Sequence, residues 1–304
     1  MKKYLNFTIL LLFLFVLIQI LLNSNIYMNC IQDSIVFWKD RIVTTILPFL
    51  LLSEFLINYG FINVINILIG PFFKWLFNIN SNVVYIFFMS LLSGFPSSAI
   101  YINNLYQNKL ISYESANKAL IICHFSNPLF IIGFIGNIIG IKYGYYILII
   151  HYLSTIIIGI IYRKHDNGIE NINNLICNKF GTVLKNGIKK AIDNLLLVLG
   201  TIIFFNILNA TLNFIELPTF LKILLNMFLE LSNGVNYVIN SFDIKLQCLF
   251  ISMILSFGGL CVHFQIISIL EESKIKYQNY LISRILQSLI SGVLVLITFN
   301  IIVN

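Results

Sequence analysis

The sequence predicts an all-α polytopic membrane protein, and three observations support that prediction. Hydrophobic residues make up 59% of the 304 residues and charged residues only 10%, whereas a soluble domain of this length needs more charge to cover its surface. Several apolar runs are long enough for a helix to cross the hydrocarbon core, which takes about 20 residues. Other apolar runs are about half that length and stop at Gly, Pro or Ser, a pattern typical of broken or re-entrant membrane helices.

Full-length apolar runs predict the spanning helices. The first covers residues 5–22 and follows Lys2 and Lys3, so we expect a retained helix with its N-terminus in the cytosol; a cleaved signal peptide is the alternative. Residues 163–190 contain six Lys or Arg and predict a cytosolic linker. Further spans are expected over residues 42–60, 143–162, 191–212 and 279–303, and interfacial helices over 61–79 and 217–231.

Half-length runs predict two re-entrant hairpins and a broken helix. Residues 83–92 and 99–106 flank the small-residue turn 93–98, and residues 246–256 and 261–270 flank a second turn at Gly258 and Gly259. Between them, residues 113–141 would form a span, but Pro128 removes a backbone donor and disfavours helix at Asn127. Freed carbonyls at membrane depth are tolerated only against protein or a wet cavity, so these breaks indicate a site.

The order of these segments predicts an inverted repeat. Both halves show a span, an interfacial helix, two half-length helices around a turn, and a further span, with Phe95 aligned to Phe257 and Tyr113 to Tyr277. Because the N-terminus and the linker are both expected inside, the halves run in opposite directions, which favours a secondary transporter with a site near the midplane. The expected units are residues 1–41 (helix and external loop), 42–162 (first repeat), 163–190 (linker) and 191–304 (second repeat).

The turn and break segments provide the candidate substrate-binding residues. Gly94 permits unusual backbone geometry, Pro96 suits the first turn of a helix, and the free N–H groups of the following half-helix favour an anion; a tight buried turn without function is the alternative. The first half contributes Ser93, Gly94, Pro96, Ser97, Ser98, His124, Ser126 and Asn127, and the second half Gly258, Gly259, His263 and Gln265.

Two charged residues inside spans are further candidates. Arg284 could balance the charge of an anionic substrate, or its side chain could extend to the membrane interface. Glu54 could transfer coupling protons, or it could pair with a basic residue near the interface.

Several function classes are not expected. The net charge of +7 includes a concentrated contribution from the linker and does not form a soluble basic face, so we expect no nucleic-acid partner. The sequence has no zinc-ligand spacing, no phosphate-binding loop, no Ser–His–Asp set and no paired catalytic carboxylates, so we expect no catalytic residues, no metal, no cofactor and no enzyme. The expected partners are the lipid bilayer and a small anionic substrate, and a homo-oligomer is compatible with the sequence.

The same segments resemble a known family. Residues 93–97 read Ser-Gly-Phe-Pro-Ser and residues 124–133 read His-Phe-Ser-Asn-Pro-Leu-Phe-Ile-Ile-Gly. Residues 230–234 read Glu-Leu-Ser-Asn-Gly and residues 257–265 read Phe-Gly-Gly-Leu-Cys-Val-His-Phe-Gln. In this order, over roughly residues 40–300, they resemble the YlbJ family of sporulation integral membrane proteins, also called the stage V sporulation protein V family.

The resemblance implies a fold and a function. It implies a "gate" or nucleoside-recognition domain similar to concentrative nucleoside transporters, with two re-entrant hairpins that meet at a central site. It further implies movement of dipicolinic acid, a pyridine dicarboxylate made in the mother cell, across the outer forespore membrane. Two other functions stay open: an H⁺- or Na⁺-coupled carrier of nucleosides or other small solutes, and a non-transporting membrane protein needed for spore-envelope assembly.

Overall fold

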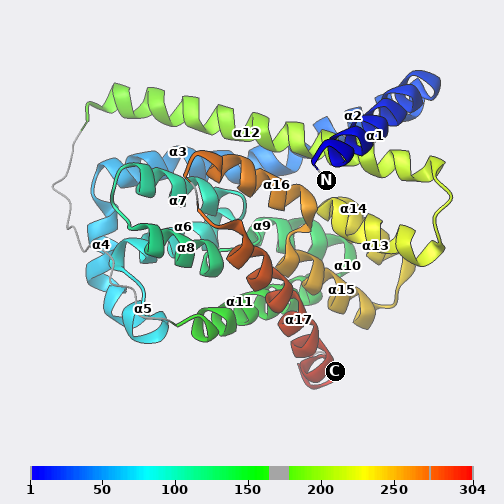
Figure 1. Cartoon of the computed structure of the whole chain (residues 1–304). Coiled ribbons are helices and arrows are strands. Elements are labelled where there is room, and N and C mark those ends of the chain that lie inside the picture. The colour runs from blue at the N-terminus through cyan, green and yellow to red at the C-terminus, as the bar shows by residue number, and fades with distance from the viewer. Residues whose placement is uncertain (1, 164–177, 274, 303–304) are drawn as a thin grey trace.

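All regular structure in the described part of the chain is helical (Figure 1). The computed structural model describes residues 2–163, 178–273 and 275–302, and within these ranges no strand occurs. Four helices are long and apolar enough to cross a membrane, or up to six if each of two bent pairs is one span. The prediction of a polytopic all-α membrane protein is therefore confirmed. The four are Ile141–Ile161, Phe180–Phe214, Ile244–Leu270 and Tyr277–Ile302.

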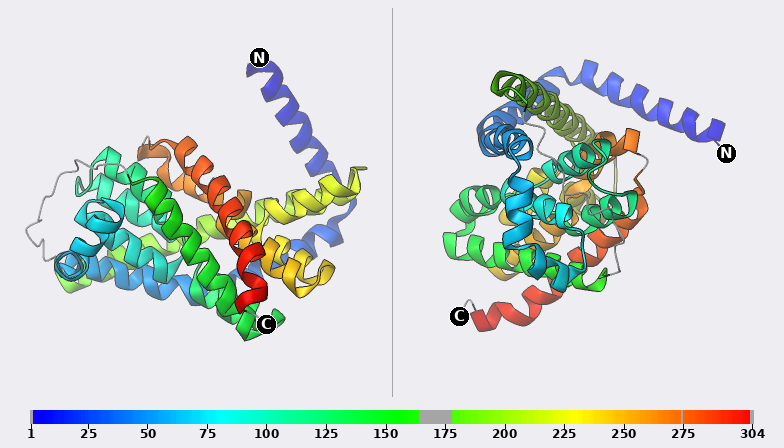
Figure 2. Two further views of the ribbon diagram at one scale, coloured as in Figure 1. Left: turned by 90° about the horizontal axis from the view of Figure 1, so that it is seen from below. Right: turned by 90° about the vertical axis from the view of Figure 1, so that its left-hand side faces the viewer.

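The N-terminal region is more helical than the sequence suggested. Helix α1 (Lys2–Leu22) extends away from the body, as Figure 2 shows, and meets the next helical stretch at an angle of 101°. The segment expected as an external loop instead forms α2 (Ser24–Phe37) and a π-helical turn, η1 (Trp38–Val43), which runs into α3 (Thr44–Asn58). The polar residues of this segment suggested a loop, because their hydrogen-bond partners lie far away in the sequence and could not be foreseen. Tyr27 bonds Thr211 at 2.9 Å, and Asn206 donates to Ser34 at 2.8 Å.

The first half contains the expected turn and break. After α4 (Phe61–Leu68) and α5 (Gly70–Phe77), α6 (Ser81–Ser93) and α7 (Ser97–Gln107) pack against each other around residues 94–96. The side chain of Asn80 accepts from Asn82 N–H at 2.9 Å and caps α6. Helix α8 (Tyr113–Ile122) ends before the predicted break, and the chain resumes as α9 (Pro128–Phe130), η2 (Ile131–Ile135) and α10 (Gly136–Ile139), followed by α11 (Ile141–Ile161).

The second half corrects two expectations. The expected interfacial helix ends early, as α13 (Thr219–Leu229), and a further helix, α14 (Leu231–Ser241), packs against it around Glu230. The turn at Gly258 is not the tip of a hairpin: α15 (Ile244–Phe257) and α16 (Gly259–Leu270) follow one another within a single 27-residue candidate span (Figure 1). Ser232, Asn233 and Gly234 lie at the start of α14, and Glu230 caps that helix.

The order of the described helices suggests a repeat in another register than the one expected from the sequence. A pair of packed short helices, a broken helix and a long helix occur as α6–α7, α8–α10 and α11, and again as α13–α14, α15–α16 and α17 (Tyr277–Ile302). In this order Pro96 corresponds to Glu230, and Asn127 corresponds to Gly258. The inversion of one half relative to the other, and the depth of the turns in the membrane, stay predictions.

The linker merges into a long helix. Helix α12 (Phe180–Thr211) includes the last eleven residues of the segment predicted as the basic linker (180–190), and the short 3₁₀ turn η3 (Leu212–Phe214) follows it. Residues 164–177 of that linker lie outside the described residues. Helix α12 packs along α2 and α3, so it connects the two halves across their whole length (Figure 1).

Candidate functional site

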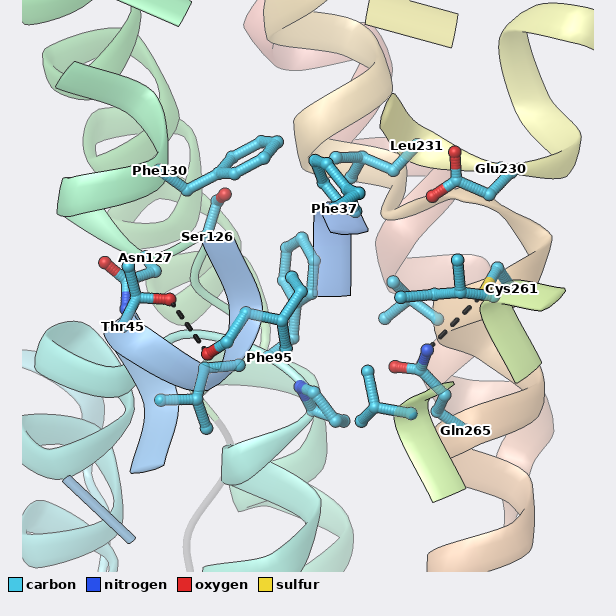
Figure 3. Close-up of a pocket in the computed structure, with 16 residues that line it drawn as sticks. Phe37, Thr45, Phe95, Ser126, Asn127, Phe130, Glu230, Leu231, Cys261 and Gln265 are labelled. Atoms are coloured by element: carbon cyan, nitrogen blue, oxygen red, sulfur yellow. Dashed lines mark hydrogen bonds between the residues drawn. The ribbon is translucent and has the colours of Figure 1, made fainter. Parts of the chain in front are cut away.

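A cavity of about 60 Å³ lies where the two halves meet (Figure 3). Ser126 and Asn127 of the first half are on one side of it, Glu230 and Gln265 of the second half on the other, and Phe95 lies between them. The helical segment α2–η1–α3 and helix α12 line the rest of the wall. The lining residues are Phe37, Ile42, Thr45, Ile46, Phe95, Pro96, Ser126, Asn127, Phe130, Val198, Ile202, Glu230, Leu231, Cys261, Val262 and Gln265.

Four helices begin at the cavity wall. Pro96, Asn127 and Glu230 are the residues that precede the first turns of α7, α9 and α14, and Cys261 lies in the first turn of α16. The first N–H groups of a helix lack intrahelical partners and bear partial positive charge, which favours an anion. Asn127 and Glu230 cap their own helices, whereas the starts of α7 and α16 have no side-chain cap.

The first turn is packed directly against the break of the neighbouring helix. Gly94 has φ +74°, and a Cβ there would lie 2.5 Å from the backbone nitrogen of Asn127. Phe95 N–H donates to the Phe125 carbonyl at 2.7 Å, and Asn127 Nδ2 donates to the Ser93 carbonyl at 3.1 Å. The turn thus satisfies backbone groups that the broken helix leaves free, as burial requires.

Two further side chains satisfy the break. His151 of α11 accepts from Ser126 N–H at 2.9 Å through Nε2, so Nδ1 holds the proton and donates to Ser256 Oγ at 3.2 Å. Arg284 of α17 donates to the Ile121 carbonyl in the last turn of α8 and to Gln287 Oε1. A cation at a helix C-terminus is favoured by the helix dipole, and Arg284 lies outside the residues that line the cavity.

Four of the residues predicted to bind substrate line the cavity: Pro96, Ser126, Asn127 and Gln265. Gln265 donates to Thr201 Oγ1 at 2.9 Å and to Cys261 Sγ at 3.3 Å, so its amide is held at the wall. Gly259 does not line the cavity but packs close to a residue that does, because a Cβ at Gly259 would lie 3.4 Å from Leu231 N. Ser93, Ser97 and Ser98 are buried and are not among the lining residues.

The two predicted histidines lie in an aromatic cluster next to the cavity. His124 stacks on Phe95 with 4.8 Å between ring centroids and bonds Tyr280 Oη at 2.9 Å through Nδ1. His263 uses both ring nitrogens, on Tyr277 Oη at 2.6 Å and on the Phe257 carbonyl at 2.9 Å. Neither ring is in the cavity wall. Among the described residues, His124 Nε2 has no hydrogen-bond partner, and it is 3.1 Å from where a Cβ at Gly258 would lie.

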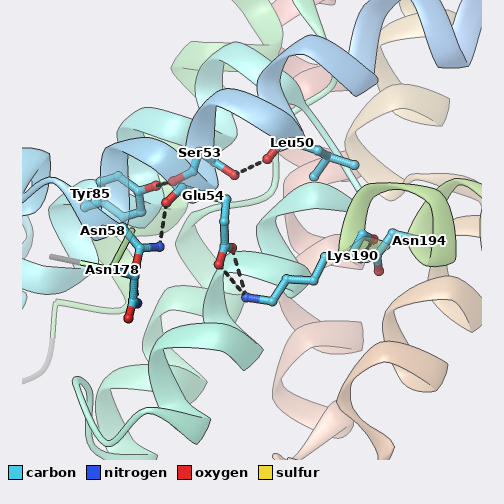
Figure 4. A network of polar contacts seen from close by, with 8 residues as sticks. All are labelled: Leu50, Ser53, Glu54, Asn58, Tyr85, Asn178, Lys190 and Asn194. Carbon is cyan, nitrogen blue, oxygen red and sulfur yellow. Dashed lines mark hydrogen bonds and ion pairs between the residues drawn. The ribbon is translucent and has the colours of Figure 1, made fainter. Parts of the chain in front are cut away.

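Glu54 lies on α3, and it is not among the residues that line the cavity (Figure 4). Lys190 Nζ lies 2.9 Å from both of its carboxylate oxygens, and a Cβ added at Gly187 would lie 3.4 Å from Glu54 Cβ. The pair joins α3 to α12 and corresponds to the alternative that the sequence left open, an ion pair with a basic residue.

Glu230 is the main residue that sequence reasoning did not select. It is only 3% exposed, lines the cavity, and its Oε2 accepts from Asn233 N–H at 2.9 Å and from Ser232 Oγ. Asn233 in turn donates to Asn206 of α12 at 2.7 Å, which fixes the start of α14. Glu is not among the side chains that usually cap a helix, so no local signal in the sequence marked Glu230 for this role.

The charge of the cavity wall is negative. Among the sixteen lining residues Glu230 is the one charged group and Cys261 the only other titratable side chain. Glu230 lies between α13 and α14, outside the four candidate spans. Burial raises the pKa of its carboxyl, while its hydrogen bonds with Ser232 and Asn233 act in the opposite direction.

Comparison with known proteins gives one relative. No family model and no solved structure matches the chain. The sporulation integral membrane protein YlbJ of Bacillus subtilis (strain 168) is 25% identical, over an alignment that covers 95% of this chain and 81% of the relative. The resemblance seen in the turn and break motifs is therefore confirmed: over nearly its whole length the chain is similar to the YlbJ family of sporulation integral membrane proteins.

Proposed function

We propose that this chain is a membrane transporter of a small anionic aromatic solute. The observation that supports this most directly is the convergence of four helix starts, two from each half, on one cavity. Backbone donors suit carboxylates, and the rings of Phe37, Phe95 and Phe130 suit a flat heterocycle.

The proposed solute is dipicolinate, moved from the mother cell across the outer forespore membrane during sporulation. Similarity to a sporulation membrane protein supports the cellular setting, and a pyridine dicarboxylate combines the aromatic ring and the negative charge to which this cavity is suited. We propose transport rather than catalysis because the described lining residues include no Ser–His–Asp set and no pair of carboxylates.

A second candidate is a carrier of nucleosides or related neutral solutes. The amides of Asn127 and Gln265 line the cavity, and no Lys, Arg or His is among the lining residues. A nucleoside needs amides and aromatic faces more than cations. Uptake of labelled dipicolinate and labelled uridine by the purified protein in liposomes separates the two candidates, and a protein with a purely structural role in the spore envelope would take up neither.

The test in cells is complementation. The chain is expressed in the mother cell of a Bacillus subtilis strain that lacks YlbJ, and spore dipicolinate is measured and normalised to the amount of protein in the membrane. We expect the wild-type chain to restore dipicolinate and Asn127→Ala to fail, because Asn127 lines the cavity and bonds the Ser93 carbonyl. Asn137→Ala, on the exposed side of α10, is the matched control and should behave as wild type. Normal dipicolinate with Asn127→Ala at normal protein levels would mean that the site is elsewhere.

A further inference from the structure

The cavity presents a conflict of charge. Its wall contains one buried carboxyl, Glu230, and no basic side chain, yet four helix starts there favour an anion. An anionic solute and an ionised Glu230 would place like charges together in a space of low dielectric, which raises the cost of ionising the carboxyl. A cation brought in with the solute removes the conflict.

We propose that Glu230 is the coupling residue: it binds a proton when the anionic solute occupies the cavity, and solute and H⁺ cross the membrane together. This inference rests on the proposed function and adds to it the coupling ion and the group that binds it. It assigns the coupling role to a residue at the turn between α13 and α14, in place of Glu54, which is paired with Lys190.

The geometry of the carboxyl allows it to alternate between two protonation states. Ser232 Oγ and Asn233 N–H both donate to Oε2, the backbone N–H groups of Leu231 and Ser232 also stabilise the carboxylate, and Figure 3 shows the side chain directed toward the cavity. A proton on Oε1 leaves Oε2 able to accept from Asn233 N–H, so the cap of α14 is retained. In the empty cavity the ionised form is stabilised by the positive end of α14. The solute therefore shifts the balance toward the protonated form without unfolding the turn.

Among the described residues around Glu230, no other group would bind the proton in its place. Cys261 of α16 is the titratable side chain that faces it across the wall, and a thiol is not a counter-charge. Asn206 of α12, which is neutral, is linked to Glu230 through hydrogen bonds by way of Asn233. The charged side chains of adjoining elements interact elsewhere or lie at a distance: Lys39 pairs with Asp40 on the exterior, Arg41 stacks on Phe134, and Lys222 lies about two turns back along α13.

The first arm of the test measures driven uptake. Purified protein in liposomes is given labelled dipicolinate and an inward proton gradient of about one pH unit at zero membrane potential, which for one proton per solute supports about tenfold accumulation. We expect the wild type to accumulate dipicolinate to about that extent and Glu230→Gln to reach only equal concentrations on both sides. Asp243→Asn removes an exposed acid at the start of α15 and should match the wild type.

The second arm needs no solute. N,N′-dicyclohexylcarbodiimide reacts with protonated carboxyls in apolar surroundings, and mass spectrometry locates the adduct. We expect the adduct on Glu230 of the wild-type protein, decreasing as pH is raised and absent in Glu230→Gln, whether or not that variant transports. This arm keeps the inference testable if the variant folds poorly.

The two arms separate failure of the inference from failure of the proposed function. Accumulation by Glu230→Gln equal to the wild type, transport driven by a Na⁺ gradient and not by pH, or no adduct on Glu230 at acidic pH would each overturn the inference while dipicolinate transport stands. A wild-type protein that transports no dipicolinate but shows the pH-dependent adduct would overturn the proposed solute and retain Glu230 as the proton-binding group.

Discussion

Replacement of Gly94 by alanine tests the packing that forms the first side of the cavity. An alanine with φ +74° and ψ −176° is in a region of backbone conformation that is essentially restricted to glycine, which costs about 1–3 kcal/mol. Its Cβ would lie 2.5 Å from Asn127 N and 2.9 Å from Asn127 Cα, so the turn must move away by about 0.9 Å to reach an ordinary 3.4 Å contact. That movement loosens the bonds from Phe95 N–H to Phe125 and from Asn127 Nδ2 to Ser93, each worth about 1 kcal/mol.

The expected total is about 3–5 kcal/mol, which for a chain of this size lowers the melting temperature by about 5–8 °C. The assay is thermal melting of the detergent-solubilised protein followed by size-exclusion fluorescence. Gly200→Ala is the matched control: a Cβ there has nothing within 4 Å, and alanine is favoured over glycine in the interior of α12 by about 0.5–1 kcal/mol. If Gly94→Ala melts within about 2 °C of the wild type, the contact between turn and break is not what holds the site together.

Three other outcomes are expected. Glu54→Lys and Lys190→Glu should each reduce the stability by about 1 kcal/mol and so lower the melting temperature. The double variant that exchanges the two charges should recover most of the lost stability. No recovery would show that the pair does not join α3 to α12. His151→Ala leaves Ser126 N–H without its acceptor and should cost about 1–3 kcal/mol, measured by the same melting assay; an unchanged melting temperature would contradict that role. A cysteine replacing Lys185 in a variant without the five native cysteines should be labelled only from the cytosolic side; labelling from outside would reverse the topology.

Sequence alone predicted where the helices break but not how the chain continues after a break. The small-residue segments 93–98 and 258–259 both stood between half-length apolar runs, so both predicted hairpins. Around residues 94–96 the two helices pack against each other, whereas α15 and α16 continue as one candidate span. Both segments interrupt apolar runs with small residues. The direction of the chain after each break is decided by contacts with distant helices, which local patterning does not encode.

The register of the repeat was wrong for the same reason. Aligning the two small-residue turns matched Phe95 with Phe257 and left Glu230 as part of a helix end. In the structure the chain turns at Glu230 through a single extended residue, φ −131° and ψ 130°, and Gly234 packs tightly on Met227. Only the absence of a Cβ at Gly234 permits that approach, and no periodicity in the sequence marks a one-residue turn between two apolar helices.

The basic candidate residues lie outside the cavity wall because a helix break in an apolar environment needs their hydrogen bonds. A break frees carbonyl and N–H groups that must find partners within the protein, and donors from neighbouring helices supply them. Arg284 forms a hydrogen bond with a carbonyl at the end of α8, and His263 with a carbonyl at the end of α15. His151 accepts from the N–H of Ser126. Polar residues beside a break are therefore expected to form hydrogen bonds with the free backbone groups. The group that can respond to a solute is the one that keeps its hydrogen bonds when its charge changes. Among the described residues of the cavity wall, Glu230 meets that condition, because one of its oxygens caps α14 in either protonation state.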